Sequence, residues 1–392
     1  MEMTMKKSWL AAACVIPFAS AAHAQSSVTL YGLIDVGLVY ANNAGGAKQY
    51  AMAVGALNGN RWGLTGAEDL GDGYKAIFKL ENGFSVATGA LGQGGAEFGR
   101  QAFVGLSGPF GTMTLGRQYD SVVDYVGVLK AGGDTAGGYA NHPADLDNTG
   151  NNYRVNNALK YASRDYKGFR FGGVFSLGGV AGNFQQNRVY SLGAGYKQGP
   201  LALGVAYLNA RNPNFSYYGN NPTSSTTASN MSSIPVYSGY ASAQTLQTIA
   251  AAAAYTIGTA TAGVVYSNVQ FLNLGATASL NPGGYSGNAV FNTVELNFRV
   301  WVAPDFLIGT SYAYTRGAQV SGGAAGGVTY NQLNLGVDYY LSKRTDIYAV
   351  VFGQHASGKD STGKDARAAI YGLTASSNGT QIAATVGLRH KF

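Results

Sequence analysis

Alternation of apolar and polar residues in segments of about ten is the feature that most restricts the fold of this chain. The clearest segment alternates Val294, Leu296, Phe298, Val300 and Val302 with Thr293, Glu295, Asn297, Arg299 and Trp301. The same pattern runs through 28–38 and 332–341. Successive side chains of a strand point to opposite faces, so each segment predicts a strand with one apolar and one polar face. Strands of this length and pattern are typical of transmembrane β-barrels.

Connectors of two sizes alternate along the chain. The short ones lie at 70–73, 107–111, 165–168, 197–200, 257–259, 303–305 and 341–344. The long ones lie roughly at 41–57, 85–98, 121–155, 177–187, 212–244, 272–289, 317–328 and 356–380. All eight prolines beyond residue 24 fall in these connectors, as a strand-rich fold requires. We therefore predict an all-β fold: a closed, antiparallel transmembrane β-barrel of 16 strands, with short periplasmic turns and long external loops.

Two other folds remain as alternatives. Strands also alternate in a soluble β-sandwich or propeller, but charged residues make up only 11% of this chain, against about 25% in ordinary globular domains. Aromatic residues also gather near the strand ends, as in the girdles of membrane barrels. The uncharged run 249–266 has the length of a membrane helix. Its Thr, Gly, Val and Tyr content favours two strands joined by a tight turn at 257–259, with a helix as the alternative.

The N-terminal segment predicts export. Two lysines precede an apolar run at 9–21, and the sequence AHA at 22–24 is a small-x-small cleavage site, so residues 1–24 are expected to be a signal peptide. A lipoprotein signal is the alternative, because Cys14 lies within the apolar run. Cys14 is the sole cysteine, so the mature chain is expected to hold no disulfide. Residues 25–392 are then expected to form one outer-membrane barrel domain, reached through the periplasm.

The C-terminal stretch TVGLRHKF predicts how the barrel closes. Its apolar residues share one face with the terminal Phe392, and its basic residues share the other. We expect this strand to pair with the first one, with Phe392 facing lipid at the periplasmic rim. A terminal aromatic in such a strand resembles the recognition signal of the barrel-assembly machinery. Phe392 is therefore the predicted assembly signal, and that machinery is a predicted partner.

Several stretches together resemble one family, the general porins of beta-proteobacteria, which are relatives of the neisserial porins. They are SSVTLYGLIDVGLVY (26–40), NRWGLTGAEDLGDGYKAIFKLENGF (60–84), GRQAFVGLSGPFGTMTLGRQYD (99–120), LSKRTDIYAVV (341–351) and VGLRHKF (386–392). The resemblance covers essentially the whole mature chain. It implies a sixteen-stranded barrel, a homotrimer, passive diffusion of small hydrophilic solutes, and a third long loop folded into the lumen. The loop at 121–155 lacks the Pro-Glu-Phe-Gly-Gly segment of enterobacterial porins, so the constriction of those relatives is not transferred.

Charges that face the lumen are the candidate functional residues, because rings of charge in a narrow aqueous path set ion selectivity. Strand phase places eight basic residues on the lumen face against the four acidic residues Asp35, Glu81, Glu295 and Asp338. The eight are Arg61, Lys75, Lys79, Arg100, Arg117, Lys160, Arg299 and Arg389. This excess predicts mild anion selectivity.

A constriction with a basic wall and an acidic loop is expected where the third loop meets the barrel. The predicted basic wall consists of Arg61, Lys79, Arg100, Arg117 and Lys160. The predicted acidic loop residues are Asp120, Asp124, Asp134, Asp145 and Asp147, opposed by Lys130 and Arg154. Facing charges of opposite sign would set up a transverse field that favours polar solutes. The alternative is that some arginines only pair with the loop carboxylates and hold the loop in place.

No catalytic residues are predicted, so the chain is not expected to be an enzyme. The sequence His142-Pro143-Ala144-Asp145 is a lone histidine near one carboxylate, without the set of nucleophile, base and orienting group that covalent catalysis needs. No metal-ligand spacing, phosphate loop or calcium loop is present, so we expect neither a metal nor a cofactor. No basic run or Lys/Arg-rich helix predicts nucleic acid as a partner.

The leading interpretation is a general diffusion porin of the Gram-negative outer membrane, passing ions, small hydrophilic solutes and anions. A substrate-specific channel of the same architecture is the first alternative; an adhesin that uses the loop at 212–244 and a barrel enzyme rank below it. Membrane lipid and lipopolysaccharide are expected partners. A polar row, Thr112, Thr114, Gly116 and Gln118, is expected on the lipid side as a subunit interface. A one-residue phase error, which would turn this row inward, is the alternative.

Overall fold

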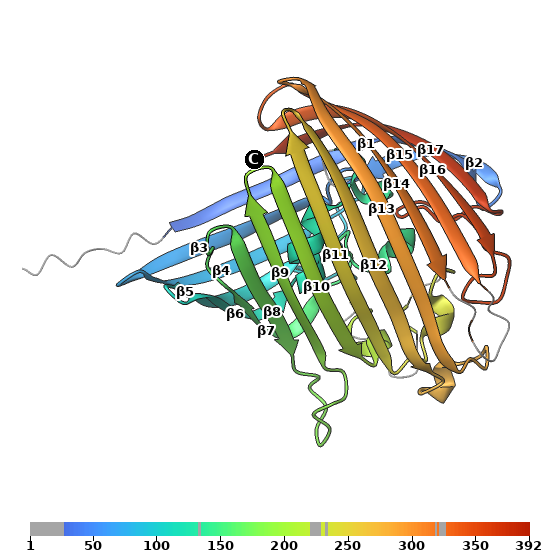
Figure 1. Cartoon of the computed structure of the whole chain (residues 1–392), viewed down its shortest axis with the longest axis horizontal. Coiled ribbons are helices and arrows are strands. Elements are labelled where there is room, and N and C mark those ends of the chain that lie inside the picture. Colours follow the sequence, from blue (N-terminus) through green and yellow to red (C-terminus); the bar gives the residue numbers. More distant parts are fainter. Residues whose placement is uncertain (1–26, 132–134, 220–228, 232–233, 318–319, 321–326) are drawn as a thin grey trace, which may run out of the picture.

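The computed structural model describes residues 27–392, apart from 132–134, 220–228, 232–233, 318–319 and 321–326. The predicted signal peptide and its cleavage site therefore lie outside the described residues. One antiparallel sheet curls into a closed cylinder in which each strand is tilted against the cylinder axis (Figure 1). This confirms the predicted all-β barrel.

Seventeen strand segments make up the sheet. Those of the first half are β1 (Ser27–Ala44), β2 (Ala47–Val54), β3 (Arg61–Gly71), β4 (Tyr74–Gly83), β5 (Gln101–Gly108), β6 (Gly111–Gln118), β7 (Val155–Ala162), β8 (Phe169–Ser176) and β9 (Val189–Gln198). Those of the second half are β10 (Leu201–Arg211), β11 (Thr245–Ile257), β12 (Ala260–Leu274), β13 (Gly287–Ala303), β14 (Phe306–Gly317), β15 (Val328–Tyr340), β16 (Thr345–Gly358) and β17 (Thr380–Lys391).

The segments amount to sixteen barrel strands, because β2 and β3 are two parts of one strand. Both pair with β1, β2 along 36–44 and β3 along 27–33. Residues 55–60 interrupt this second barrel strand. Asp35 of β1 fixes the interruption, since its carboxylate accepts hydrogen bonds from the Leu57 and Asn58 amides at 2.8 and 2.7 Å. The interruption bends inward and places Arg61 at its end.

The predicted long connector at 41–57 is wrong. β1 continues to Ala44, a two-residue turn follows at Gly45 and Gly46, and β2 begins at Ala47. Both glycines have positive φ, 66° and 110°, which is the backbone that a tight hairpin turn needs. The other seven long connectors lie near their expected places, and we number them loop 2 (84–100), loop 3 (119–154), loop 4 (177–188), loop 5 (212–244), loop 6 (275–286), loop 7 (318–327) and loop 8 (359–379).

Closure of the barrel follows the C-terminal prediction. β17 pairs with β1 from Leu33 opposite Lys391 to Ala41 opposite Ala383. Backbone hydrogen bonds between Phe392 and Gly32, at 3.0 and 3.1 Å, extend this ladder to the last residue. The Phe392 ring covers Gly32 on the outer face and is 43% exposed. Its position at the rim is as predicted.

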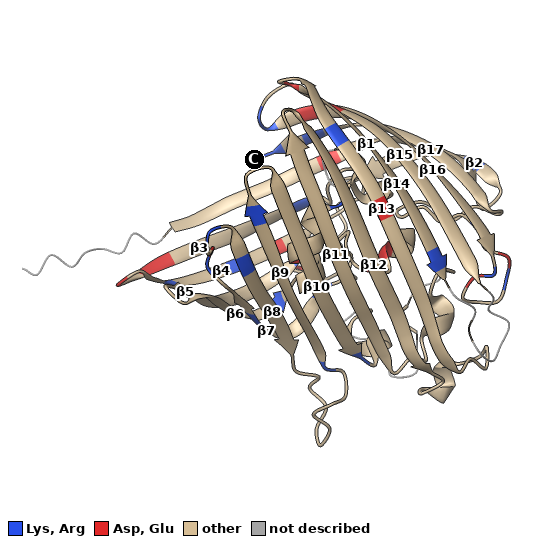
Figure 2. Ribbon diagram, in the orientation of Figure 1, with Lys and Arg blue, Asp and Glu red and all other residues tan. Residues whose placement is uncertain are grey.

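The outer face of the barrel is apolar, and the strand phases of three segments are confirmed. Leu30, Leu296 and Leu333 are more than half exposed, whereas their neighbours in the alternation, such as Glu295 and Gln332, are buried. Most of the strand surface carries no charge, and β11 and β12 carry none at all (Figure 2). Such a face suits lipid.

The phase predicted for β6 is wrong. Met113 and Leu115 are exposed on the outer face, whereas Thr114 is buried and points inward. The polar row that includes Thr114 therefore faces the barrel interior and is not a subunit interface. A bulge at Gly116, which has a φ of 138°, shifts the register between β6 and β7. The bulge also changes the alternation on which the prediction relied.

The uncharged run 249–266 forms two strands, as predicted. It contributes to β11 and β12, which are joined at Gly258 with a φ of 57°. Among the residues that the structure describes, no helix has the length and apolar character needed to cross a membrane. In the described part of the chain, helical turns occur only in loops: η1 (Val122–Val126), η2 (Gly127–Leu129), η3 (Gly137–Ala140), η4 (Pro143–Asp145), α1 (Pro213–Ser216), η5 (Ser238–Tyr240) and η6 (Ala278–Leu280).

Candidate functional site

Loop 3 lies inside the barrel, against the inner wall. Its helical turns are visible within the cylinder behind β9 to β12 (Figure 1). Hydrogen bonds join it to three inward-facing wall residues at intervals. The Ser121 amide donates to Ser191 at 2.9 Å, the Ala131 amide donates to Glu295 at 2.7 Å, and Gln332 donates to the Tyr139 carbonyl at 2.6 Å. The loop therefore narrows the lumen, as the family resemblance implied.

Wall glycines let the loop approach the sheet closely. A Cβ atom on Gly204 of β10 would collide with the carbonyl oxygen of Tyr125. A Cβ atom on Gly336 of β15 would collide with the carbonyl oxygen of Thr135. Any larger residue at these positions would push the loop backbone off the wall, so the glycines fix how far loop 3 extends into the lumen.

A buried cluster of charges ties loop 3 to the far wall. His142 Nδ1 lies 2.6 Å from Asp147 Oδ2, and His142 Nε2 lies 3.3 Å from Glu295 Oε2 of β13. Ser267 of β12 donates to the same Asp147 oxygen at 2.5 Å. Burial by itself would lower the pKa of His142, but the Asp147 charge, with help from Glu295, raises this pKa to about 10. A protonated His142 thus bridges the loop and the wall, and we call His142, Asp147 and Glu295 the latch.

Two other loop carboxylates are used within loop 3 and its neighbours. Asp120 accepts hydrogen bonds from Asn148 and from Tyr217 of loop 5, both at 2.7 Å. Asp145 accepts from the Gly150 and Asn152 amides at 2.7 and 3.0 Å. Burial raises the pKa of both groups, that of Asp145 to about 6. These carboxylates shape the loop and present no charge to the lumen.

A basic cavity lies between loop 3, loop 2 and the interruption in the second barrel strand. It has a volume of about 380 Å³, and its lining includes Arg61, Arg100, Lys130 and Arg154. No aspartate or glutamate occurs among the described residues that line it. Burial and then the Arg100 charge lower the pKa of Arg154, which reflects the crowding of like charges at this point. We identify this cavity as the candidate constriction.

A small hydrogen-bond network orients the wall cations. Glu81 of β4 accepts from Arg100 Nε at 2.8 Å and from the Tyr31 hydroxyl at 2.8 Å. Lys79 lies 3.7 Å from the same carboxylate. Arg100 also donates to the Tyr119 hydroxyl at 3.2 Å. Glu81 is buried beneath these groups, so it neutralises part of the basic wall from behind and does not line the cavity.

The predicted constriction residues fall into separate groups. Arg61 and Arg100 line the basic cavity, and Lys79 stands next to it on Glu81. Lys160 lies in a second cavity of about 610 Å³, where its ammonium group is 2.5 Å from the Asp124 carboxylate. Arg117 lies beside the β6 bulge and donates to the Gly99 carbonyl at 2.8 Å and to Asn156.

The expected acidic face of the constriction needs correction. Asp120, Asp145 and Asp147 are at most 1% exposed and hydrogen-bonded inside the loop, because a buried carboxylate is stable only when it is fully paired. Asp124 is partly exposed, but Lys160 neutralises it. Asp134 lies outside the described residues. The described part of loop 3 therefore contributes its cations, not its acids, to the basic cavity.

Sequence reasoning missed several lining residues. Lys130 and Arg154 were expected to oppose the loop acids, yet both line the basic cavity together with Asn58, Asn152 and Tyr371. The Arg154 guanidinium carbon lies 5.5 Å from the centroid of the Tyr119 ring. Arg154 directly precedes β7 in the sequence, and this position alone could have indicated that it lies near the wall. Asn58 and Tyr371 belong to segments whose course inside the barrel has no sequence signature.

The arrangement offers little for covalent catalysis. The Ser267 hydroxyl of the latch donates to Asp147 and does not contact a histidine nitrogen as a nucleophile would. Among the described residues, no group of three or more His, Cys, Asp or Glu side chains is placed to hold a metal ion. What the arrangement does provide is a cavity inside the barrel with cations in its lining.

Comparisons with known proteins agree with this architecture. A family described as Gram-negative porin matches residues 10–360. An outer membrane porin protein of Bordetella pertussis is 31% identical to this chain, and the aligned region spans 99% of this chain and 100% of that protein. A major outer membrane protein P.IB of Neisseria meningitidis serogroup B is 32% identical over a region that spans 52% of this chain and 70% of that protein. The solved anion-selective porin from Comamonas acidovorans superimposes with a TM-score of 0.71, at 23% identity, over 94% of this chain and 100% of its own. The predicted family is confirmed: this chain belongs to the Gram-negative porins.

Proposed function

We propose that this porin is a general diffusion channel of the outer membrane that passes small hydrophilic solutes and ions and prefers anions. The observation that carries the proposal is the basic cavity, which is lined by Arg61, Arg100, Lys130 and Arg154 and by no described carboxylate. A hydrated anion in this cavity lies within one Debye length, about 8 Å in physiological salt, of several cations. Cations are repelled by the same groups, so the cavity acts as a charge filter.

Assembly follows from the same proposal. Residues 1–24 are removed on export, and residues 25–392 insert in the outer membrane with lipid and lipopolysaccharide against the apolar outer face. The barrel-assembly machinery reads Phe392 at the rim. The functional unit is a homotrimer, as the family resemblance implies. The second cavity is lined by Arg170, Lys197 and Arg299 together with the Lys160–Asp124 ion pair, so its lining keeps an excess of cations.

Reversal potentials in a potassium chloride gradient across a planar bilayer test the selectivity. We expect the sign of an anion-preferring channel. The substitution Arg61→Gln should lower the ratio of chloride to potassium permeability by a factor of about two to five. This estimate follows because one charge at about 8 Å in water contributes roughly 0.5 kcal/mol to each ion, with opposite signs.

Lys343→Gln is the matched control, because Lys343 is an exposed cation in the short turn between β15 and β16. It removes the same charge far from the basic cavity and should leave the permeability ratio unchanged. A cation-preferring reversal potential of the unaltered channel would refute the proposed selectivity. An equal effect of both substitutions would attribute selectivity to net charge instead of the cavity.

A further inference from the structure

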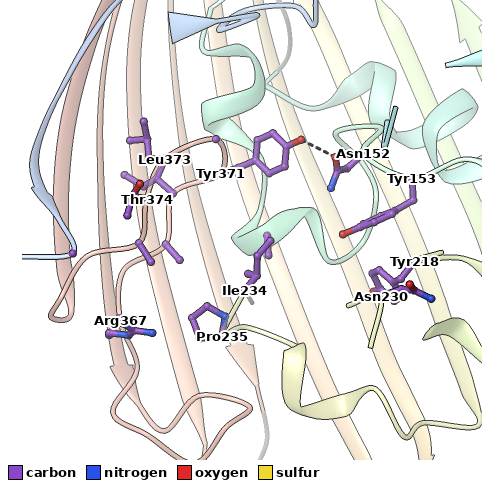
Figure 3. A pocket seen from close by; sticks show the side chains of 17 residues that line it. Asn152, Tyr153, Tyr218, Asn230, Ile234, Pro235, Arg367, Tyr371, Leu373 and Thr374 are labelled. Atoms are coloured by element: carbon purple, nitrogen blue, oxygen red, sulfur yellow. Dashed lines mark hydrogen bonds between the residues drawn. The ribbon is translucent and has the colours of Figure 1, made fainter. Parts of the chain in front are cut away.

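A third, mostly apolar cavity adjoins the basic one. It has a volume of about 860 Å³ and lies between loop 3, loop 5 and loop 8; we call it the vestibule. Figure 3 shows Tyr371 reaching from loop 8 toward Asn152 of loop 3, with Ile234 and Pro235 of loop 5 on a third side. The Tyr371 hydroxyl donates to Asn152 at 2.7 Å. Asn152 and Tyr371 line both cavities, so a solute that leaves the vestibule inward enters the basic cavity.

The vestibule walls offer flat aromatic and aliphatic surface. Tyr153 and Tyr218 meet edge to face, with ring centroids 4.6 Å apart, and Leu373 and Ile370 lie on the loop 8 side. Planar rings pack well in such surroundings, because aromatic side chains stack on or against them. A cavity of this size and character is in the range that holds small organic ligands.

Two polar groups in the vestibule lack partners within the described part of the chain. Arg367 of loop 8 is half-buried, and neither an ion pair nor a hydrogen bond joins it to a described residue. The Tyr218 hydroxyl is buried, with Tyr218 only 3% exposed, and has no hydrogen-bond partner among described groups. A buried hydroxyl without a partner is unfavourable, so its position indicates a ligand or solvent oxygen at this point.

Taken together, these features define one class of solute. We propose that the vestibule binds aromatic carboxylates that carry a second oxygen on the ring, and so loads them into the basic cavity. The ring lies against the apolar walls, the carboxylate pairs with Arg367, and the ring oxygen accepts a hydrogen bond from Tyr218. No described carboxylate lines the vestibule. This inference rests on the proposed anion-passing function and names the solute class that it favours.

The test is block of single-channel current by added solutes, measured on the purified full chain in planar bilayers. 4-Hydroxybenzoate is expected to reduce the chloride current at a concentration at least about tenfold lower than acetate or cyclohexanecarboxylate does. The substitution Arg367→Gln should raise the half-blocking concentration of 4-hydroxybenzoate by about tenfold or more, since it removes a charge-assisted hydrogen bond. Lys364→Gln, which removes an exposed cation of the same loop outside the vestibule, should leave that concentration unchanged.

Tyr218→Phe examines the second contact without altering the packing. It should abolish the preference for 4-hydroxybenzoate over benzoate and leave the block by benzoate as it was. An anion-preferring channel that 4-hydroxybenzoate blocks no better than acetate would overturn this inference and leave the proposed function intact. Block by maltose instead of the aromatic acid would overturn it in favour of a sugar site. A cation-preferring reversal potential would count against the proposed function itself.

Discussion

The latch between loop 3 and the wall makes the most direct prediction. In the variant His142→Leu, the carboxylates of Asp147 and Glu295 stay buried, at most 1% exposed, but lose the cation between them. Breaking a buried charge pair in this way costs about 3–5 kcal/mol. If that cost falls on the attachment of loop 3, the equilibrium between attached and detached loop shifts by roughly 150- to 5,000-fold. The barrel strands keep their own hydrogen-bond ladders and should stay assembled.

Two measurements separate loop detachment from general instability. Single-channel recordings of His142→Leu should show new current fluctuations and substates, because loop 3 sets the lumen width. The temperature at which the barrel loses its compact mobility on a denaturing gel should fall much less. The double variant His142→Leu with Glu295→Gln should recover most of the quiet behaviour, because Asp147 keeps the hydroxyls of Ser267 and Thr149 as donors.

The pH dependence of the latch has a definite sign. His142 has a pKa of about 10 in the folded protein and about 6.5 when unfolded, so its contribution is complete below about pH 6.5. It declines as the pH rises through about 10. The pKa of Asp147 lies below its usual value: burial alone would raise it, but the charge of His142 lowers it. The Asp147 contribution is therefore lost only in strong acid.

Wild-type channels should thus be quiet from about pH 5 to 6.5, fluctuate more as the pH rises from there, and fluctuate most above pH 10, whereas His142→Leu should not respond to alkaline pH. The reasoning is refuted if His142→Leu conducts as quietly as the wild type. It is also refuted if the effects of the two substitutions simply add, since the latch model requires them to interact.

Two further predictions concern packing and assembly. Gly336→Val should push loop 3 off the wall at Thr135, at a cost of about 1–3 kcal/mol, and so alter the single-channel conductance. Gly353→Val is the control and should leave the conductance unchanged, because the nearest atom is 3.8 Å from the new Cβ. Equal conductance of both variants would contradict the wall contact. Phe392→Ala should lower the yield of assembled barrels in the outer membrane several-fold, measured by heat-modifiable gel mobility. The conductance of the barrels that do assemble should stay unchanged. An unchanged yield would argue against Phe392 as the assembly signal.

The fold was largely predictable from local patterns. Alternation fixed the phases of β1, β13 and β15, because lipid on one side and water on the other select opposite residue types on the two faces. The predicted short turns were confirmed as well. Prolines marked several of them, because a turn needs no backbone N–H for a hydrogen bond to a neighbouring strand. The failures have local causes as well. Gly45 and Gly46 were interpreted as part of a long loop, although they form a hairpin turn, and the bulge at Gly116 changed the alternation in β6.

The interior of the barrel was not predictable in the same way. In loop 3, Asp147 accepts a hydrogen bond from Ser267 and His142 contacts Glu295, and both wall residues are more than one hundred residues away along the chain. No periodicity links a loop residue to a wall residue on another strand. A charge in a loop therefore had two equally acceptable positions, on the pore surface or in a buried pair, and only the packing of loop 3 decides between them.

Pairing, and not charge count, determines what the pore presents to an ion. Loop 3 uses the carboxylates of Asp120, Asp145 and Asp147 to hold its own shape and to attach to the wall. Buried carboxylates of this kind contribute little to the potential in the lumen, because hydrogen-bond donors and His142 balance them at short range. Within the described part of the chain, Arg61 by contrast donates only to the Gly59 carbonyl, at 3.3 Å, and keeps its charge at the cavity surface. The acids that balance the basic wall in the sequence are thus removed from the pore by folding, and the proposed anion preference rests on that removal more than on the net charge of +7.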